Sequence, residues 1–100
     1  MAGFEIRAST PERLEASGAL CFDGASQALR AGLNLIPHNA ACTIDLSQVT
    51  EADSAGLAVL VEWLATARKR SSRIRYLGIP AQILAVARIS DLDDLIQGTE

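Results

Sequence analysis

The sequence predicts an α/β domain in which a mixed sheet of about four strands is covered by helices, in the order β-β-α-β-α-β-α. Two patterns predict this. Residues 4–9 and 13–20 alternate apolar and polar side chains, which is typical of half-buried strands. Later apolar residues recur at helical spacing, and helices between strands require crossover connections. The 100-residue length and 49% hydrophobic content suit one compact core, so we assign residues 1–100 to a single domain.

The first two elements are predicted to be the strands of a hairpin. Residues 4–9 alternate apolar and polar side chains, and Pro11 in the Thr-Pro-Glu segment favours a turn. Residues 13–20 alternate again, so every second side chain of this strand should face the core. The expected inward residues are Leu14, Ala16, Gly18 and Leu20.

The middle of the chain predicts a helix, a strand and a loop. Asp23 is expected to cap a helix that Pro37 ends. The inward face of this helix should carry Ala25, Leu29, Leu33 and Ile36. Residues 41–46 are rich in β-forming side chains and predict a strand, whereas residues 47–54 are polar and are expected to form a loop.

The clearest helical pattern covers residues 55–70. Its apolar stripe consists of Leu57, Leu60, Val61 and Leu64. A strand is expected over residues 73–79, and Pro80 fits the first position of a further helix. Residues 91–97 are expected to close the chain as a short turn or helix.

The stretch VTEADSAGLAVLVEW places an acid and a hydroxyl where a strand passes into a helix. One interpretation is structural: Asp53 or Ser54 accepts hydrogen bonds from the first turn and is an N-cap. The other is a docking surface, because Ala55 and Gly56 are small and ligands of open α/β sheets bind at this edge. A phosphate on Ser54 would meet free N–H groups on one side and the carboxylates of Asp53 and Glu51 on the other.

This stretch, read with the strand before it, resembles the signature of STAS domains, the fold of sulfate transporters and anti-sigma-factor antagonists. In that family a strand ends in Asp, and a short loop leads to Asp-Ser/Thr-x-Gly and a helix. The matching positions are Asp45, Asp53, Ser54 and Gly56. The element order is similar across nearly the whole chain, so the resemblance implies a STAS fold.

Two branches of the family imply two functions. In anti-sigma-factor antagonists, a partner kinase phosphorylates the serine that matches Ser54, and this abolishes partner binding. In the MlaB branch, the domain is a non-enzymatic subunit of a bacterial ABC transporter that moves phospholipids between the inner and outer membranes. The chain resembles this branch more, on its Glu62-Trp63 pair and the segment from Tyr76 to Ser90. The resemblance implies an MlaF-like ATPase partner in a complex with an MlaE-like permease and an MlaD-like lipid-binding subunit, at the cytoplasmic face of the inner membrane.

In the MlaB branch the hydroxyl of the signature lies in the surface that holds the ATPase. The expected partner-binding residues are Ser54, Asp53, Ala55, Gly56, Glu51 and Trp63. Ser54 is also the candidate for phosphorylation. On a helical wheel Trp63 lies off the leucine stripe, so it either folds over the edge of the core or, as we favour, anchors the partner interface.

The sequence gives little support to an enzyme or a metal site. Ser54 lacks a G-x-S-x-G elbow, and His38, the one histidine, is distant in sequence. No phosphate-binding loop is present, so we expect no catalysis and no cofactor. Asp45, Glu51 and Asp53 do not have the spacing of a metal-binding loop, so no metal is expected.

Charge and hydropathy bear on partners and location. The net charge of −3 argues against a general nucleic-acid binder. We find neither a secretory signal at the start nor an apolar stretch long enough to span a bilayer, and we expect a cytosolic protein with Cys21 and Cys42 reduced. Five basic residues gather between Arg68 and Arg75. They form either a solvated helix end or a docking patch for an acidic partner or lipid headgroups.

Overall fold

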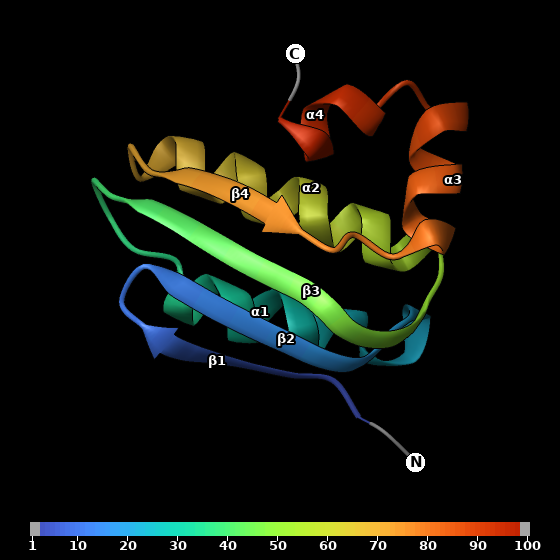
Figure 1. Cartoon of the computed structure of the whole chain (residues 1–100), viewed down its shortest axis with the longest axis horizontal. Coiled ribbons are helices and arrows are strands. Elements are labelled where there is room, and N and C mark those ends of the chain that lie inside the picture. Colours follow the sequence, from blue (N-terminus) through green and yellow to red (C-terminus); the bar gives the residue numbers. More distant parts are fainter. Residues whose placement is uncertain (1–2, 99–100) are drawn as a thin grey trace.

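The computed structural model describes residues 3–98 and consists of a sheet with helices packed against it (Figure 1). The elements are β1 (Glu5–Thr10), β2 (Arg13–Leu20), the 3-10 turn η1 (Phe22–Gly24), α1 (Ala25–Leu35), β3 (Ala41–Ala52), α2 (Ser54–Lys69), β4 (Arg73–Leu77), α3 (Ala81–Ile89) and α4 (Asp93–Gln97). The predicted β-β-α-β-α-β-α order is confirmed, and the expected short closing element is α4.

The sheet has four strands in the order β1-β2-β3-β4. β1 and β2 pair antiparallel, as predicted for a hairpin, whereas β2 with β3 and β3 with β4 pair parallel. The predicted mixed sheet is therefore confirmed. Because β2, β3 and β4 run in one direction, their carboxyl ends lie at the same edge, on the right in Figure 1.

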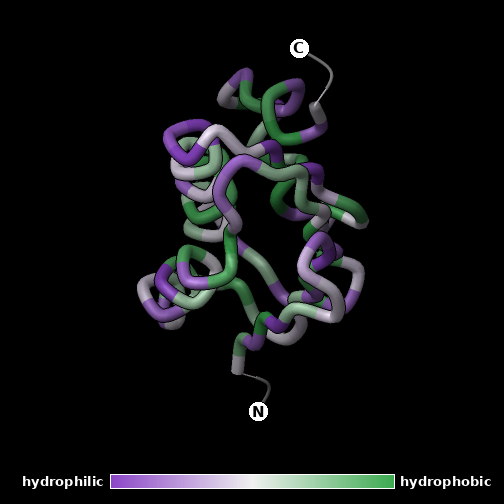
Figure 2. Tube along the Cα trace, turned by 90° about the vertical axis from the view of Figure 1, so that its left-hand side faces the viewer, coloured by the Kyte–Doolittle hydropathy of each residue, from purple (hydrophilic) through white to green (hydrophobic). Residues whose placement is uncertain are grey.

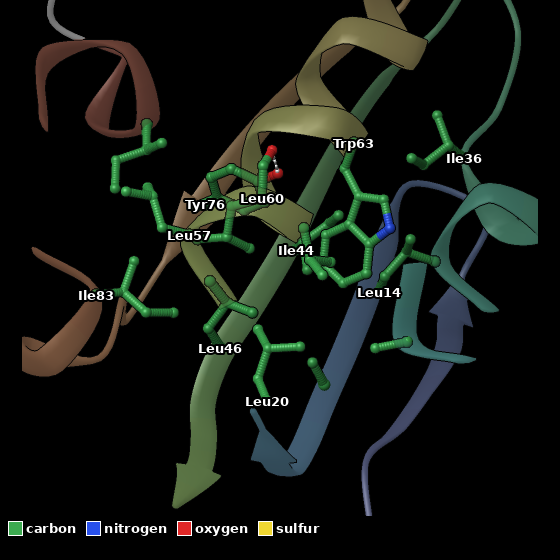
Figure 3. Packing of buried hydrophobic residues seen from close by; sticks show 14 of the residues in the cluster. Leu14, Leu20, Ile36, Ile44, Leu46, Leu57, Leu60, Trp63, Tyr76 and Ile83 are labelled. Carbon is green, nitrogen blue, oxygen red and sulfur yellow. Dashed lines mark hydrogen bonds between the residues drawn. The ribbon is translucent and has the colours of Figure 1, made fainter. Parts of the chain in front are cut away.

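The core lies between the sheet and the helices α1 and α2, which cover one of its faces (Figure 1). Along β2 the burial alternates over the whole strand, and the predicted inward residues are all buried. Leu14 of β2, Ile44 of β3 and Leu60 of α2 are fully buried and gather in the same region (Figure 3). Each such leucine or isoleucine contributes about 1.5–3 kcal/mol when removed from water. In Figure 2, hydrophobic and hydrophilic residues alternate along the trace of the chain.

β3 continues well beyond its predicted end at Leu46. It runs from Ala41 to Ala52, so the predicted loop over residues 47–54 is wrong. Pairing with β2 extends to Leu20 opposite Ala52, with two shifts of register on the way. At each shift β3 carries one more residue than β2; such an extra residue is left unpaired, and the pairing resumes beyond it. The strand thus delivers the chain directly to the N-cap of α2.

The buried stripe of α2 differs from the predicted one. Its buried residues are Gly56, Leu57, Val59, Leu60, Trp63 and Ala67. Val61 and Leu64, which were expected in the stripe, are only half-buried. The helix is rotated about its axis relative to the prediction because α1 packs against the side that carries Trp63.

The predicted inward face of α1 is confirmed at Ile36, which is buried in the core, but it is shifted at the other positions. Ala28 and Gly32 are its buried residues, whereas Leu29 and Leu33 are half-buried. Small residues let a helix approach its neighbour closely, and here Gly32 lies against the ring of Trp63. The leucines consequently pack at the flanks of the contact rather than at its centre.

Three predicted element ends are corrected. Asp23 does not cap α1, because it lies in η1 and Gly24 occupies the N-cap position without a side-chain hydrogen bond. β4 ends at Leu77, two residues before the predicted end at position 79, where Gly78 adopts a left-handed φ of 65°. Pro80 is the N-cap of α3 rather than its first residue.

Arg70, a member of the basic cluster, has a structural role. Its Nη1 donates hydrogen bonds to the carbonyl oxygens of Leu33, at 2.7 Å, and Ile36, at 2.8 Å. The Leu33 carbonyl lacks its usual helical donor, because the residue four positions on is Pro37, which has no N–H. Arg70 therefore fastens the end of α1 to the end of α2.

Candidate functional site

The candidate site lies at the sheet edge formed by the carboxyl ends of β2, β3 and β4 (Figure 1). Turn η1 follows β2 here, α2 begins after β3, and α3 begins after β4. The backbone N–H of Phe22 donates to Asp53, which joins the first two segments. Gly56 of α2 lies next to Ile83 of α3, which joins the last two.

Asp53 is the N-cap of α2. Its Oδ1 accepts a hydrogen bond of 2.9 Å from the Ala55 N–H, and its backbone is extended, as N-caps require. Its Oδ2 accepts a second hydrogen bond, of 3.1 Å, from the Phe22 N–H of η1. One carboxylate therefore caps the helix and also fixes the turn after β2. Of the two residues that the sequence offered as caps, Asp53 fills the role.

Ser54 is the first residue of α2 and is exposed. Within residues 3–98 its hydroxyl makes no hydrogen bond, because the capping contact belongs to Asp53. Glu51, near the end of β3, is also exposed, and Ala55 is half-buried. An exposed hydroxyl without an internal partner can bond to a docked protein or accept a phosphoryl group.

Gly56 lies beneath this surface rather than in it. It is buried, and a β-carbon at this position would lie 2.8 Å from the Leu20 carbonyl oxygen and 3.0 Å from the Ile83 Cδ1. Glycine lets the first turn of α2 pack directly on the end of β2. The members of the Asp-Ser-x-Gly motif thus divide their roles: the acid caps, the glycine packs, and the serine faces solvent.

Trp63 does not belong to the docking surface, and our interpretation of it as an interface anchor is wrong. Its side chain is 0% exposed and lies at the centre of the core (Figure 3). Its Nε1 donates a 3.1 Å hydrogen bond to the Leu29 carbonyl, and its ring centroid lies 6.3 Å from that of Phe4. The side of α2 that the helical wheel placed off the leucine stripe is covered by α1 and by Phe4, which precedes β1.

The site is acidic. The Cys21 thiol, at the end of β2, has its pKa raised by burial and then by the negative charges of Asp53, Glu51 and Asp23. These three carboxylates therefore all lie within electrostatic range of Cys21, at the end of β2. Within the described chain none of them forms an ion pair with a basic side chain. The raised pKa also keeps Cys21 protonated at neutral pH, so it is a poor nucleophile.

Sequence reasoning missed Phe22. It lies in η1 directly beside Asp53, and its side chain is 78% exposed. Phenylalanine is usually buried in folded proteins, so this exposure is informative. No local signal predicted this exposure, because Phe22 continues both the alternation that ends at Leu20 and the helical spacing that begins at Ala25.

The acidic residues and the histidine that the sequence analysis considered do not form one cluster in the part of the chain that the structure describes. Among residues 3–98, no three His, Cys, Asp or Glu side chains are arranged to hold a metal ion. Asp45 is engaged elsewhere, with Arg13 at 2.7 Å and with the Ser47 N–H at 2.9 Å. His38 precedes β3 and therefore lies at the opposite end of that strand from Ser54. None of the helices between residues 3 and 98 combines the length and the hydrophobicity that a bilayer span requires.

A hollow of about 970 Å³ lies far from this edge. Its lining includes the first residues of β3 and β4 and the end of α4. These strand starts lie at the amino ends of the parallel strands, opposite to Ser54. None of the predicted partner-binding residues lines it.

Comparison with known proteins identifies a family. The family described as "Mlab, STAS domain" matches residues 6–97, which is nearly the whole chain. No curated protein matches the sequence.

Solved structures show where the fold recurs. An anti-sigma-factor antagonist, SpoIIAA in its unphosphorylated form, aligns with a TM-score of 0.69 and 16% identity, covering 91% of this chain and 83% of that one. A putative anti-sigma-factor antagonist from Thermotoga maritima aligns with a TM-score of 0.72 and 16% identity, covering 94% and 83%. A sulfate transporter family protein from Wolinella succinogenes aligns with a TM-score of 0.63 and 18% identity, covering 87% and 71%. At these identities the structures share the fold with this chain, and their functions do not transfer.

Proposed function

This chain belongs to the Mlab STAS domain family, and on that premise we propose that it is a non-enzymatic subunit that binds the ATPase of an ABC transporter moving phospholipids between bacterial membranes. The MlaF-like ATPase is the direct partner. The MlaE-like permease and the MlaD-like lipid-binding subunit complete the complex, which holds this chain at the cytoplasmic face of the inner membrane. The family match is the main support for this proposal, because it covers residues 6–97.

The main structural support for a docking site is that Ser54 has a hydroxyl that is accessible to a partner. Its hydroxyl is exposed and free of internal hydrogen bonds in the described chain, while Asp53 performs the capping. Ser54 is therefore available to a partner at no cost to the helix. We assign the docking surface to Ser54, Glu51 and the exposed part of Ala55, with Asp53 and Gly56 holding it in shape.

A non-enzymatic role agrees with the surroundings of Ser54. A nucleophilic serine needs a base within hydrogen-bond reach, and His38 lies at the other end of β3. We expect purified protein to hydrolyse neither ATP nor simple esters above background. Hydrolysis that disappears in Ser54→Ala would contradict this part of the proposal.

A second candidate function is an anti-sigma-factor antagonist that is switched by phosphorylation. The exposure of Ser54 favours it, because a kinase needs an accessible hydroxyl. A phosphate there would add a charge of about −2 beside Glu51 and Asp53, and it would change how the surface docks.

Affinity capture from the source cells, followed by identification of the bound proteins, distinguishes the two functions. We expect an ABC ATPase with its permease to be captured. Capture of a histidine-kinase-like anti-sigma factor, together with phosphate on Ser54, would support the second function instead.

Variants of Ser54 then test the docking surface against the purified ATPase. Ser54→Asp should fold, because an acid is favourable in the first turn of a helix. It should nevertheless lose binding, because it replaces the hydroxyl at the contact by a carboxylate, and a carboxylate buried at an interface without a cation of its own costs several kcal/mol. Ser54→Thr keeps the hydroxyl and should bind.

Ala65→Glu is the matched control for added charge. It lies exposed on the same helix, about 16 Å along the axis from Ser54. It should bind like wild type, and thermal melts should show all three variants folded. Full binding by a well-folded Ser54→Asp protein would remove Ser54 from the docking surface.

A further inference from the structure

Phe22 is an exposed aromatic residue at the edge that carries Ser54. Its side chain is 78% exposed, whereas Trp63 and Tyr76 are 0% and 7% exposed. A fully buried phenylalanine contributes favourable transfer free energy that this one does not contribute to the fold. That free energy is available to a partner that covers the ring.

The backbone of Phe22 is held in place. Its N–H donates to Asp53 Oδ2 at 3.1 Å, and the Gly24 N–H closes the turn by donating to the Cys21 carbonyl at 3.1 Å. Asp53 is also bound to the first turn of α2 through the Ala55 N–H. The turn and the helix start are therefore joined through one carboxylate, so Phe22 is presented next to Ser54. A turn whose backbone is already fixed loses less entropy on binding than a mobile one.

The charges around Phe22 define the chemistry of its partner. Asp23 and Glu51 are exposed, and with Asp53 they act together on the Cys21 thiol. Within residues 3–98 no basic side chain neutralises them. A partner surface that covers Phe22 must therefore supply cations to these carboxylates.

We propose that Phe22 is the apolar anchor of the docking surface and enters an apolar cavity of the ATPase subunit that is rimmed by lysine or arginine side chains. This inference rests on the proposed function, because it takes the ATPase as the occupant. A second copy of this chain would set one acidic surface against another, and anionic lipid headgroups would meet the same repulsion. Asp53 is a positioning residue here, since it fixes the turn that carries Phe22.

The test is the affinity of the purified ATPase subunit for matched variants, measured by calorimetry. Phe22→Ala should weaken binding by about 30-fold or more, the loss typical of an interface hot spot. Ile89→Ala is the control, because Ile89 is the other large exposed apolar residue, at 86%, and lies at the end of α3 away from this edge. It should bind within about twofold of wild type. Both variants remove exposed side chains, so their melting temperatures should stay close to that of wild type.

Charge variants test the rim of the cavity. Glu51→Gln and Asp23→Asn should slow association and reduce its dependence on salt between about 50 and 300 mM NaCl, because steering between opposite charges is screened by salt. Glu62 is exposed in the middle of α2, and Glu62→Gln should change neither the association rate nor its dependence on salt. If the association rate of the wild type does not depend on salt, the partner's cavity is not surrounded by basic side chains and this part of the inference is wrong.

The outcomes separate this inference from the proposed function. If the wild type binds the ATPase and the two variants Phe22→Ala and Ile89→Ala bind it with equal affinities, then Phe22 is not the anchor, although the ATPase is still the partner. No binding by wild type would overturn both. A Phe22-dependent dimer in sedimentation, or Phe22-dependent binding to phosphatidylglycerol vesicles, would assign the surface to a different occupant and overturn the inference.

Discussion

Gly32 of α1 lies so close to the indole of Trp63 in α2 that a β-carbon at position 32 would overlap three atoms of the ring. The two residues are complementary: the largest side chain of the core is accommodated where the other helix has none. The Trp63 Nε1 also donates to the Leu29 carbonyl of the same helix, at 3.1 Å. This contact sets the distance between α1 and α2, and it explains why Trp63 is buried.

Gly32→Ala should therefore destabilise the protein although alanine is the better helix former. The added methyl group forces Trp63 or α1 to move, and overpacking of this kind costs about 1–3 kcal/mol. Urea unfolding followed by Trp63 fluorescence gives the measurement. Gly24→Ala is the control, because a β-carbon there meets nothing within 4 Å. If Gly32→Ala is as stable as Gly24→Ala, the close contact does not exist in solution.

Arg70→Met should lower the free energy of unfolding by about 1.5–3 kcal/mol. The variant keeps an apolar stem but removes both hydrogen bonds to the end of α1, and bonds from a charged donor are the stronger kind. Lys69→Met changes the same charge at the exposed neighbouring position and should stay within about 0.5 kcal/mol of wild type. Equal urea midpoints for the two variants would show that Arg70 is only part of a solvated basic cluster.

Ser71→Gly should stabilise the protein by about 0.5–1 kcal/mol. Ser71 follows α2 with a φ of 57°, and the Ser72 N–H donates to the Ala67 carbonyl at 2.8 Å, so the helix ends on a left-handed residue. A side chain in this conformation costs about 1–2 kcal/mol, which glycine avoids, although glycine also gains entropy in the unfolded chain.

A serine at the end of another helix is the control for the stabilisation expected of Ser71→Gly. Ser90, the C-cap of α3, has an ordinary φ of −95°. Ser90→Gly should therefore leave the stability unchanged or lower it slightly, as measured by thermal and urea unfolding. Stabilisation of equal size at both positions would mean that the backbone conformation of Ser71 is not the cause.

The free energy of unfolding should depend on pH through the ionisation of Asp45. The hydrogen bonds from Ser47 and the nearby Arg13 guanidinium hold the pKa of Asp45 below its ordinary value of 3.8. A carboxyl whose pKa is lowered by folding stabilises the fold fully above its unfolded pKa, and this contribution is lost as the pH falls through the folded pKa. Asp45→Asn should consequently be less stable than wild type at pH 7, and its stability should decline less below pH 4.

Urea unfolding at pH 7, 4 and 3 measures this difference. Glu62→Gln, on the exposed side of α2, removes a carboxylate that makes no ion pair within residues 3–98. It should retain the wild-type dependence on pH. Parallel stability curves for Asp45→Asn and wild type would rule out a role for Asp45.

Much of the fold could be predicted because it depends on local patterns. In β2 the alternation has a period of two over the whole strand, which assigns each side chain to one face of the sheet. The start of α2 was also predictable, because an acid before small residues favours a helix N-terminus whatever lies around it. The sequence located the candidate site in the same way, at the Asp-Ser-x-Gly motif, but it could not decide whether Asp53 or Ser54 was the cap.

The sequence by itself determined the order of the elements, the inward face of β2 and the place of the Asp-Ser-x-Gly motif at the start of α2, since hydrophobic periodicity and helix capping act over a few residues. Only the tertiary structure decided the rest. α2 is apolar on most of its circumference, so its buried face was chosen by the close approach of α1 at Gly32. The second half of β3 is a strand because it pairs with β2. Phe22 is exposed because a hydrogen bond to Asp53, 31 residues away in the chain, holds its turn at the edge of the sheet. Each of these depends on contacts between distant segments, and a local pattern carries no information about which segments will meet.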